Sequence, residues 1–142
     1  DELRHRATGE EQAESDTGLI CGRDLEAGGT VMGLHSRKGH FAALTNCRTQ
    51  QRRPEAEKTS RGLLVERLLL EGPEAAAAFL QKHALDGFHV VFGDVLSRTE
   101  LPELHYAWCY PQEDSEGQLR CWRQGRRQLG RGVFVVSNES PS

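Results

Sequence analysis

The chain has 142 residues, a formal net charge of −3 and an apolar fraction of 37%. That length suffices for one domain with its own core, and so small a net charge argues against a nucleic-acid partner. No apolar run approaches the roughly 20 residues that span a bilayer, and no signal peptide is visible. The sequence therefore predicts a single domain, residues 1–142, with no transmembrane segment and no nucleic-acid partner.

The first half of the chain predicts three strands. Residues 1–17 are polar, and the stretch EEQAESD (10–16) predicts an exposed loop. Short apolar stretches at 18–24 and 30–35 predict strands. The glycine-containing stretch 36–39 predicts a hairpin loop that leads into a strand at 40–46, so the last two strands should pair antiparallel.

Helical periodicity replaces the strand pattern near Thr59. Thr59 or Ser60 can cap the amino terminus of a helix whose leucines form one apolar face. Gly72 and Pro73 should end this helix and start the next, because proline is favoured in the first helical turn. The alanine-rich stretch 74–85 continues that second helix with strong helix formers.

Strand-like patterns return after the helices. The expected strands are 88–95, 104–110, 118–123 and 132–138. Helices grouped between blocks of strands predict an α+β fold with antiparallel sheets. Arginines cluster along 120–131, expected as a hairpin, and are read as a solvated surface or, alternatively, as a face that binds a partner.

The cysteines and histidines show no metal-site spacing. Cys21, Cys47, Cys109 and Cys121 form no Cys-x-x-Cys pair and no Cys/His arrangement typical of zinc. Reduced thiols are expected in the absence of a secretory signal, and no metal site is predicted.

Three hydrogen-bonding side chains, Asn46, Cys47 and Arg48, end the strand at 40–46, where a turn residue such as glycine or proline would be usual. Two interpretations stay open for Asn46: a turn former that bonds its own backbone, or a side chain that lines a site. Cys47 is expected to be a small buried apolar residue rather than a nucleophile.

Several stretches carry a resemblance to a known family. GRDLEAGGTVMGLHSRKGHFAALTNCR (22–48), SRGLLVERLL (60–69), LDGFHVVFGD (85–94) and GVFVVSN (132–138) resemble, in order and spacing, the blocks of the transport and Golgi organisation 2 family. That family is also named after an Asn-Arg-Asp-Glu motif. Asp1-Glu2 resembles the last two residues of this motif. Val31 and His89 stand where the family usually has Trp and Asn.

The resemblance implies a fold similar to N-terminal nucleophile hydrolases: antiparallel sheets stacked between helix layers (αββα). The chain would be the central part of that domain, incomplete at both ends, with a Cys nucleophile upstream of Asp1. By position, Asn46 and Asn138 match strand-end amides that would stabilise an oxyanion, and Asp1 matches the residue that orients the nucleophile. Arg48 and Arg61 are candidate contacts for a carboxylate or phosphate. Asn138 as a turn former and Arg61 as cover for a helix start are the alternatives.

For function, the resemblance implies haem trafficking, or lipid and Golgi homeostasis, without settling whether the chain is an enzyme. The resemblance assigns no definite cofactor, and haem or another small apolar molecule with a carboxylate is the candidate ligand. The alternatives are a cysteine-type amidohydrolase and a protein-interaction module that uses the arginine-rich residues 120–131. The expected location is the cytoplasm, with Golgi or mitochondrial association as further options.

Overall fold

A computed structural model of the chain describes residues 8–11, 17–24, 31–47, 59–83, 85–96, 103–112, 115–116 and 121–137. The elements are β1 (Thr8–Glu11), β2 (Leu19–Asp24), β3 (Met32–His35), β4 (His40–Asn46), α1 (Arg61–Glu71), α2 (Pro73–Lys82), β5 (Phe88–Asp94), β6 (Glu103–Gln112) and β7 (Cys121–Leu129). All paired strands are antiparallel. The α+β class is therefore confirmed.

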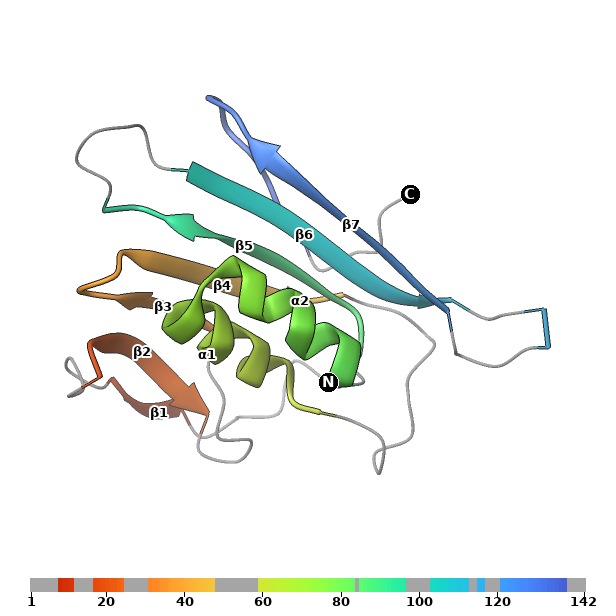
Figure 1. Cartoon of the computed structure of the whole chain (residues 1–142), viewed down its shortest axis with the longest axis horizontal. Coiled ribbons are helices and arrows are strands. Elements are labelled where there is room, and N and C mark those ends of the chain that lie inside the picture. The colour runs from red at the N-terminus through yellow and green to blue at the C-terminus, as the bar shows by residue number, and fades with distance from the viewer. Residues whose placement is uncertain are drawn as a thin grey trace.

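The strands form one seven-stranded sheet in chain order, from β1 to β7 (Figure 1). The two helices are inserted between β4 and β5, which are nevertheless neighbours in the sheet. These strands pair along their whole length, from His40 opposite Asp94 to Asn46 opposite Phe88. The helical pair therefore leaves the sheet at one end, crosses one face and returns to the same end (Figure 1).

The core lies between this face and the two helices. Its members include Leu64, Val65, Leu68 and Leu69 of α1, Phe79 of α2, Ala42 and Leu44 of β4, and Phe88, Val90 and Phe92 of β5. Because successive side chains of a strand point to opposite faces, the even-numbered residues of β5 face the helices. His89 and Val91 must then lie on the other face of the sheet.

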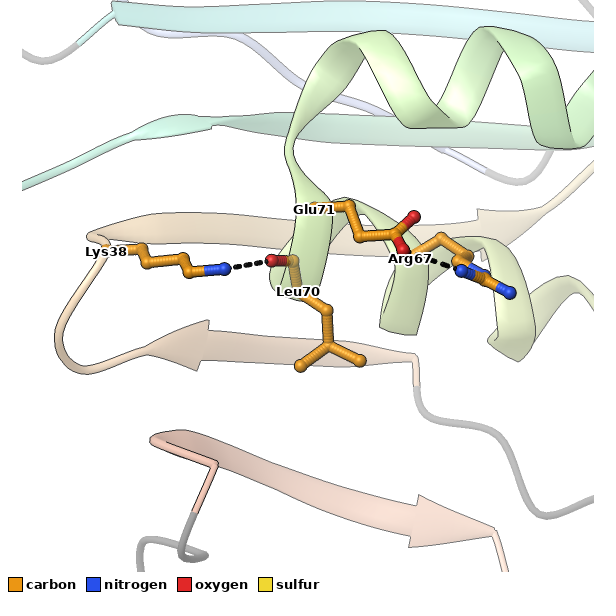
Figure 2. Close-up of polar contacts among 4 residues, drawn as sticks. All are labelled: Lys38, Arg67, Leu70 and Glu71. Atoms are coloured by element: carbon orange, nitrogen blue, oxygen red, sulfur yellow. Dashed lines mark hydrogen bonds and ion pairs between the residues drawn. The ribbon is translucent and has the colours of Figure 1, made fainter.

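The β3–β4 hairpin holds the carboxyl end of α1. Carbonyls in the last turn of a helix have no partner within the helix. The Leu68 carbonyl accepts the Gly72 N–H at 3.1 Å, the Leu69 carbonyl accepts His40 Nδ1–H at 3.0 Å, and Lys38 Nζ donates to the Leu70 carbonyl at 2.5 Å (Figure 2). The cationic ammonium also suits the negative end of the helix dipole.

His35 stabilises the same hairpin from inside. Its ring is 3% exposed, and Nδ1 accepts the backbone N–H of Lys38 at 3.1 Å and of Arg37 at 3.3 Å. Burial lowers the pKa of His35, and the positive charges of Lys38, Arg37 and His40 lower it further, against a hydrogen bond to the Thr17 backbone that raises it. The hairpin therefore favours a neutral imidazole.

Several sequence predictions are confirmed. Strand 40–46 has the expected bounds, and a hairpin turn occupies residues 36–38. Gly72, at φ 88°, separates the two helices, and Pro73 begins the second. Ser60 takes the N-cap position of α1 without a side-chain capping bond. The described residues form one sheet with one helix layer, so the second sheet of an αββα arrangement stays a prediction.

The loop expected over residues 10–16 and the arginine-rich hairpin expected over 120–131 are both wrong in part. Thr8–Glu11 form β1, which pairs with β2. Cys121–Leu129 form one strand, β7, rather than a short strand at 118–123 followed by a hairpin. The reason is the partner: β7 pairs residue by residue with β6, from Gln112 to Leu104. Tertiary pairing here overrides the weak strand propensity of glycine and charged residues.

The strand expected at 132–138 is also wrong over the described part, residues 132–137, which belong to no helix or strand. Val133 and Val135 are 95% and 90% exposed, whereas Phe134 and Val136 are 44% and 36% exposed. The alternation is that of a strand, but strand assignment requires a hydrogen-bonded neighbour. The Phe134 ring instead lies 6.0 Å from the Arg127 guanidinium.

Candidate functional site

Aromatic side chains gather on the face of the sheet opposite the helices. His89 of β5 and Tyr106 of β6 have ring centroids 6.0 Å apart at an interplanar angle of 10°, and Tyr106 stacks on Trp108 at 5.4 Å. Tyr106 and Trp108 share a face because they are two residues apart on one strand. Together with Arg127 of β7, these side chains form what we call the aromatic cluster.

The sheet register makes room for Trp108. Gly125 of β7 is its cross-strand partner. A Cβ added at Gly125 would lie 2.0 Å from Cζ2 of Trp108, so the indole ring lies directly against the backbone of β7. Only a glycine permits this contact, which fixes the position of the ring.

A hydrogen bond of 2.8 Å links the Tyr106 hydroxyl to Nδ1 of His89. His89 is 3% exposed, while Tyr106 is half-buried. Burial raises the pKa of Tyr106, and Cys47 raises it further, while the Arg127 cation acts in the opposite direction. The phenol is therefore neutral at physiological pH, held between a buried imidazole and an arginine.

Two neighbouring arginines of β7 have their side chains on opposite faces of the sheet. The guanidinium of Arg127 lies 5.7 Å from the Tyr106 ring centroid, and that of Arg126 lies 5.1 Å from the Phe92 ring on the helix side. Both distances suit cation–π attraction. Arg127 therefore puts an exposed positive charge at the border of the aromatic cluster, and Arg126 does not.

Of the residues singled out near the end of the β4 strand, Asn46 shares the helix face of the sheet with its partner Phe88, and Arg61 begins α1, so neither belongs to the face of the aromatic cluster. Asn46 is the last residue of β4 and is exposed. The carbonyl of Gly87 accepts both the Cys47 N–H at 2.9 Å and Arg61 Nη1–H at 2.7 Å. The end of β4, the start of α1 and the start of β5 therefore meet at one carbonyl. Cys47 is 5% exposed and forms no disulfide, so its expected burial is confirmed.

Asp1, Arg48 and Asn138 lie outside the described residues. The expectation that they share a cleft with Asn46 therefore stays a prediction. Among the described residues, the structure brings together Asn46, Cys47 and Arg61.

Sequence reasoning did not select His89 or Tyr106. The usable signal was the spacing of Tyr106 and Trp108, which places two aromatic rings on one face of a strand. Their contact with His89 depends on the β5–β6 register, in which Trp108 is opposite His89 and Tyr106 is opposite Val91. Local sequence does not encode that register.

The described part of the chain shows neither a metal-binding group nor a membrane-spanning helix. No three side chains drawn from histidine, cysteine, aspartate and glutamate are placed to hold a metal ion there. No described helix combines the length and apolar character that crossing a membrane requires.

The fold and the aromatic cluster together define the class of protein. It is an α+β domain with a helical pair on one face of an antiparallel sheet and an aromatic cluster on the other face. A family profile, Transport and Golgi organisation 2, matches residues 1–142, the whole chain. The chain belongs to the Transport and Golgi organisation 2 family. Neither the curated proteins nor the solved structures contain a match, so likeness to N-terminal nucleophile hydrolases stays a prediction.

Proposed function

We propose that this family member binds an apolar molecule that carries a carboxylate, either haem or a fatty acid, and hands it on without chemical change. The observation that carries the proposal is the aromatic cluster with Arg127 at its border. The cellular roles that follow are haem trafficking, or lipid and Golgi homeostasis, from a cytoplasmic location.

The chemistry of the cluster suits such a ligand. Aromatic rings offer a large apolar surface on which a porphyrin or an acyl chain can pack. An arginine guanidinium donates paired hydrogen bonds to a carboxylate, and a hydrogen bond to a charged group contributes about 1.5–3 kcal/mol. An apolar surface with a few polar groups is the usual composition of a ligand site.

In this proposal the residues near the end of β4 add polar contacts at that end of the sheet, on its helix side. Arg61 is already held against the Gly87 carbonyl, which orients its guanidinium. Asn46 supplies an exposed amide, and Arg48 follows two residues later in the sequence. Asp1 and Asn138 complete the set that the family resemblance assigns.

Two adjacent arginines provide the test. Haem, and separately a fatty acid, would be titrated into the wild type, Arg127→Ala and Arg126→Ala. Loss of one charged contact should weaken binding by about ten- to a hundredfold in Arg127→Ala, and Arg126→Ala should bind as the wild type does. Arg48→Ala should also weaken binding.

If Arg127→Ala and Arg126→Ala bind each ligand with equal affinity, the aromatic cluster is not part of the ligand site. Failure of both ligands to bind the wild type would refute ligand handling altogether.

A second candidate function is amide hydrolysis by a cysteine-type enzyme. The exposed amide of Asn46 at the end of β4 favours it, because such a donor can stabilise a tetrahedral oxyanion without a charge to desolvate. The nucleophile would come from upstream of Asp1. The test is hydrolysis of amide substrates by a chain that begins with that cysteine, with Asn46→Ala as the variant that should lose about 100-fold in rate.

A further inference from the structure

The last strand of the sheet, β7, has one edge that no other described strand covers. Its nine residues pair with β6, and among the described residues no strand lies on its other side (Figure 1). In an antiparallel edge strand, every second residue directs its backbone N–H and C=O away from the neighbouring strand. Such groups form a template on which an extended peptide can add a further strand.

Two exposed arginines stand next to each other on this edge strand. The Arg126 guanidinium lies 5.1 Å from the Phe92 ring on the helix face, and the Arg127 guanidinium lies 5.7 Å from the Tyr106 ring on the other face. A strand added beside β7 would lie about 4.8 Å away, so a side chain opposite either arginine would be within reach of it. The edge therefore offers one positive charge on each face.

The residue before the two arginines, Gly125, offers a different contact. Trp108 of β6 is its cross-strand partner, and a Cβ added at Gly125 would lie 2.0 Å from the indole ring. The ring therefore covers the backbone of β7 at this position. A side chain of an added strand opposite Gly125 would meet this ring instead of a cross-strand side chain, so an apolar residue fits there.

We propose that the outer edge of β7 binds an acidic, extended segment of a partner protein, which adds to the sheet as a further antiparallel strand. The segment carries two successive acidic residues, opposite Arg127 and Arg126, followed by an apolar residue opposite Gly125. Antiparallel pairing is expected because every paired strand of this sheet is antiparallel. The proposal is independent of the ligand proposed above, in which Arg126 takes no part.

The charge of the edge selects the partner. Successive side chains of a strand point to opposite faces, so two adjacent carboxylates would meet the two arginines, one on each face. An arginine guanidinium donates paired hydrogen bonds to a carboxylate. Charged side chains on an edge strand discourage pairing with other strands, and here only an acidic strand would offset both charges. The same arginines therefore reject basic segments and favour acidic ones.

The first experiment uses a synthetic peptide of nine residues, the length of β7: Thr-Thr-Glu-Glu-Val-Thr-Thr-Thr-Thr. During its titration into the wild type, the backbone amide chemical shifts of β7 should change saturably in NMR spectra. The same peptide with both glutamates replaced by glutamine keeps the shape and removes the charge. It should bind about two- to thirtyfold more weakly, because two cross-strand charge pairs are lost.

The second experiment reverses one charge on each side. Arg126→Glu should bind the acidic peptide about two- to thirtyfold more weakly than the wild type does, because an attraction becomes a repulsion. A peptide with lysine in place of its second glutamate should show the opposite preference and bind Arg126→Glu more tightly than the wild type. A general loss of structure in Arg126→Glu cannot produce this reversal, and thermal unfolding checks that the fold is retained.

The third experiment tests whether the peptide adds as a strand. Two acidic peptides would carry methyl groups on their backbone nitrogens, one at the odd-numbered and the other at the even-numbered positions. A methylated nitrogen cannot donate a hydrogen bond, and only alternate residues of an antiparallel strand donate to a given neighbour. One methylated peptide should therefore keep its binding, and the other should lose it.

Each outcome decides one part of the proposal. If the acidic peptide does not bind the wild type, strand addition is refuted, and the arginines serve only to discourage pairing at this edge. If the glutamine peptide binds equally well, or the lysine peptide does not prefer Arg126→Glu, the acidic partner is overturned. If both methylated peptides bind alike, the peptide does not pair with β7. If the wild type alone associates with rising concentration and Arg126→Glu does not, the edge binds a second copy of the chain and not a partner protein.

Discussion

Tyr106 and His89 are 17 residues apart in sequence, yet the phenol oxygen and the imidazole Nδ1 lie 2.8 Å apart with nearly parallel rings. The contact joins β5 to β6 on the face opposite the helices. It exists only because these strands pair in one register, since a slip of one residue would move one of the rings to the other face. Substitutions that disturb the aromatic cluster should therefore also affect the pairing of the strands that carry it.

Gly125→Ala should disturb the cluster directly. Its Cβ would overlap the Trp108 ring, and this part of the ring cannot move without displacing its stack with Tyr106. We expect a loss of about 1–3 kcal/mol in the free energy of unfolding and a changed Trp fluorescence spectrum. Gly130→Ala is the control, because nothing lies within 4 Å of its added Cβ. Equal stabilities of the two variants would show that Trp108 does not lie against β7.

The buried His35 should make stability depend on pH. Because its pKa in the folded chain lies below the ordinary value of 6.5, the unfolded chain binds the proton more readily. The contribution of His35 is complete above pH 6.5 and is lost as pH falls through 6.5 toward the lower folded pKa. In His35→Gln, the free energy of unfolding between these limits, measured with a denaturant, should depend less on pH than in the wild type. A wild-type slope in His35→Gln would contradict this assignment.

The contact between Lys38 and the end of α1 should stabilise the fold modestly. Lys38→Met keeps the aliphatic stem but removes the donor and the charge, and we expect a loss of about 0.5–1 kcal/mol in the free energy of unfolding. Arg67→Met is the comparison (Figure 2). The Arg67–Glu71 pair is 2.8 Å long but about half exposed, so its loss should cost less than about 0.5 kcal/mol. A larger effect at Arg67 would argue against the role of Lys38.

Leu69→Ala should destabilise the fold far more than Leu63→Ala. Leu69 is fully buried between α1 and the sheet, and its truncation should cost about 2–5 kcal/mol because a cavity remains. Leu63 lies on the same helix but is 37% exposed, so its truncation should cost less than about 1 kcal/mol. Similar midpoints of chemical denaturation for the two variants would mean that the helix is rotated relative to this description.

The parts of the fold that sequence predicted are those with strong local signals. Strand 40–46 follows a hairpin turn that ends at Gly39, whose φ of 75° favours glycine. The break between the helices is set by Gly72 and Pro73, which no helix interior tolerates well. In each case a local conformational restriction decides the structure.

The parts that sequence predicted poorly depend on distant partners. β7 contains glycine and several arginines, yet it is a long strand because β6 offers a full edge for pairing. Residues 133–136 have the opposite character, with high strand propensity but no pairing in the described structure. Strand propensity measures how well a side chain fits a packed sheet, and it does not identify the neighbouring strand.

The residues of the candidate site also differ in how far the sequence alone could predict them. Asn46 and Arg61 could be selected from sequence because a strand end and a helix start are local features. The pair formed by His89 and Tyr106 could not, since it requires the register between β5 and β6.

The most direct test of the central proposal is ligand binding at Trp108. In a Trp122→Phe background, where Trp108 is the only tryptophan, ferric haem and a fatty acid would each be titrated while fluorescence is recorded. If the aromatic cluster is the site, at least one ligand should change the Trp108 emission saturably at one molecule per chain, and Arg127→Ala should shift the midpoint about ten- to a hundredfold upward. A linear, non-saturating response to both ligands would contradict the proposal.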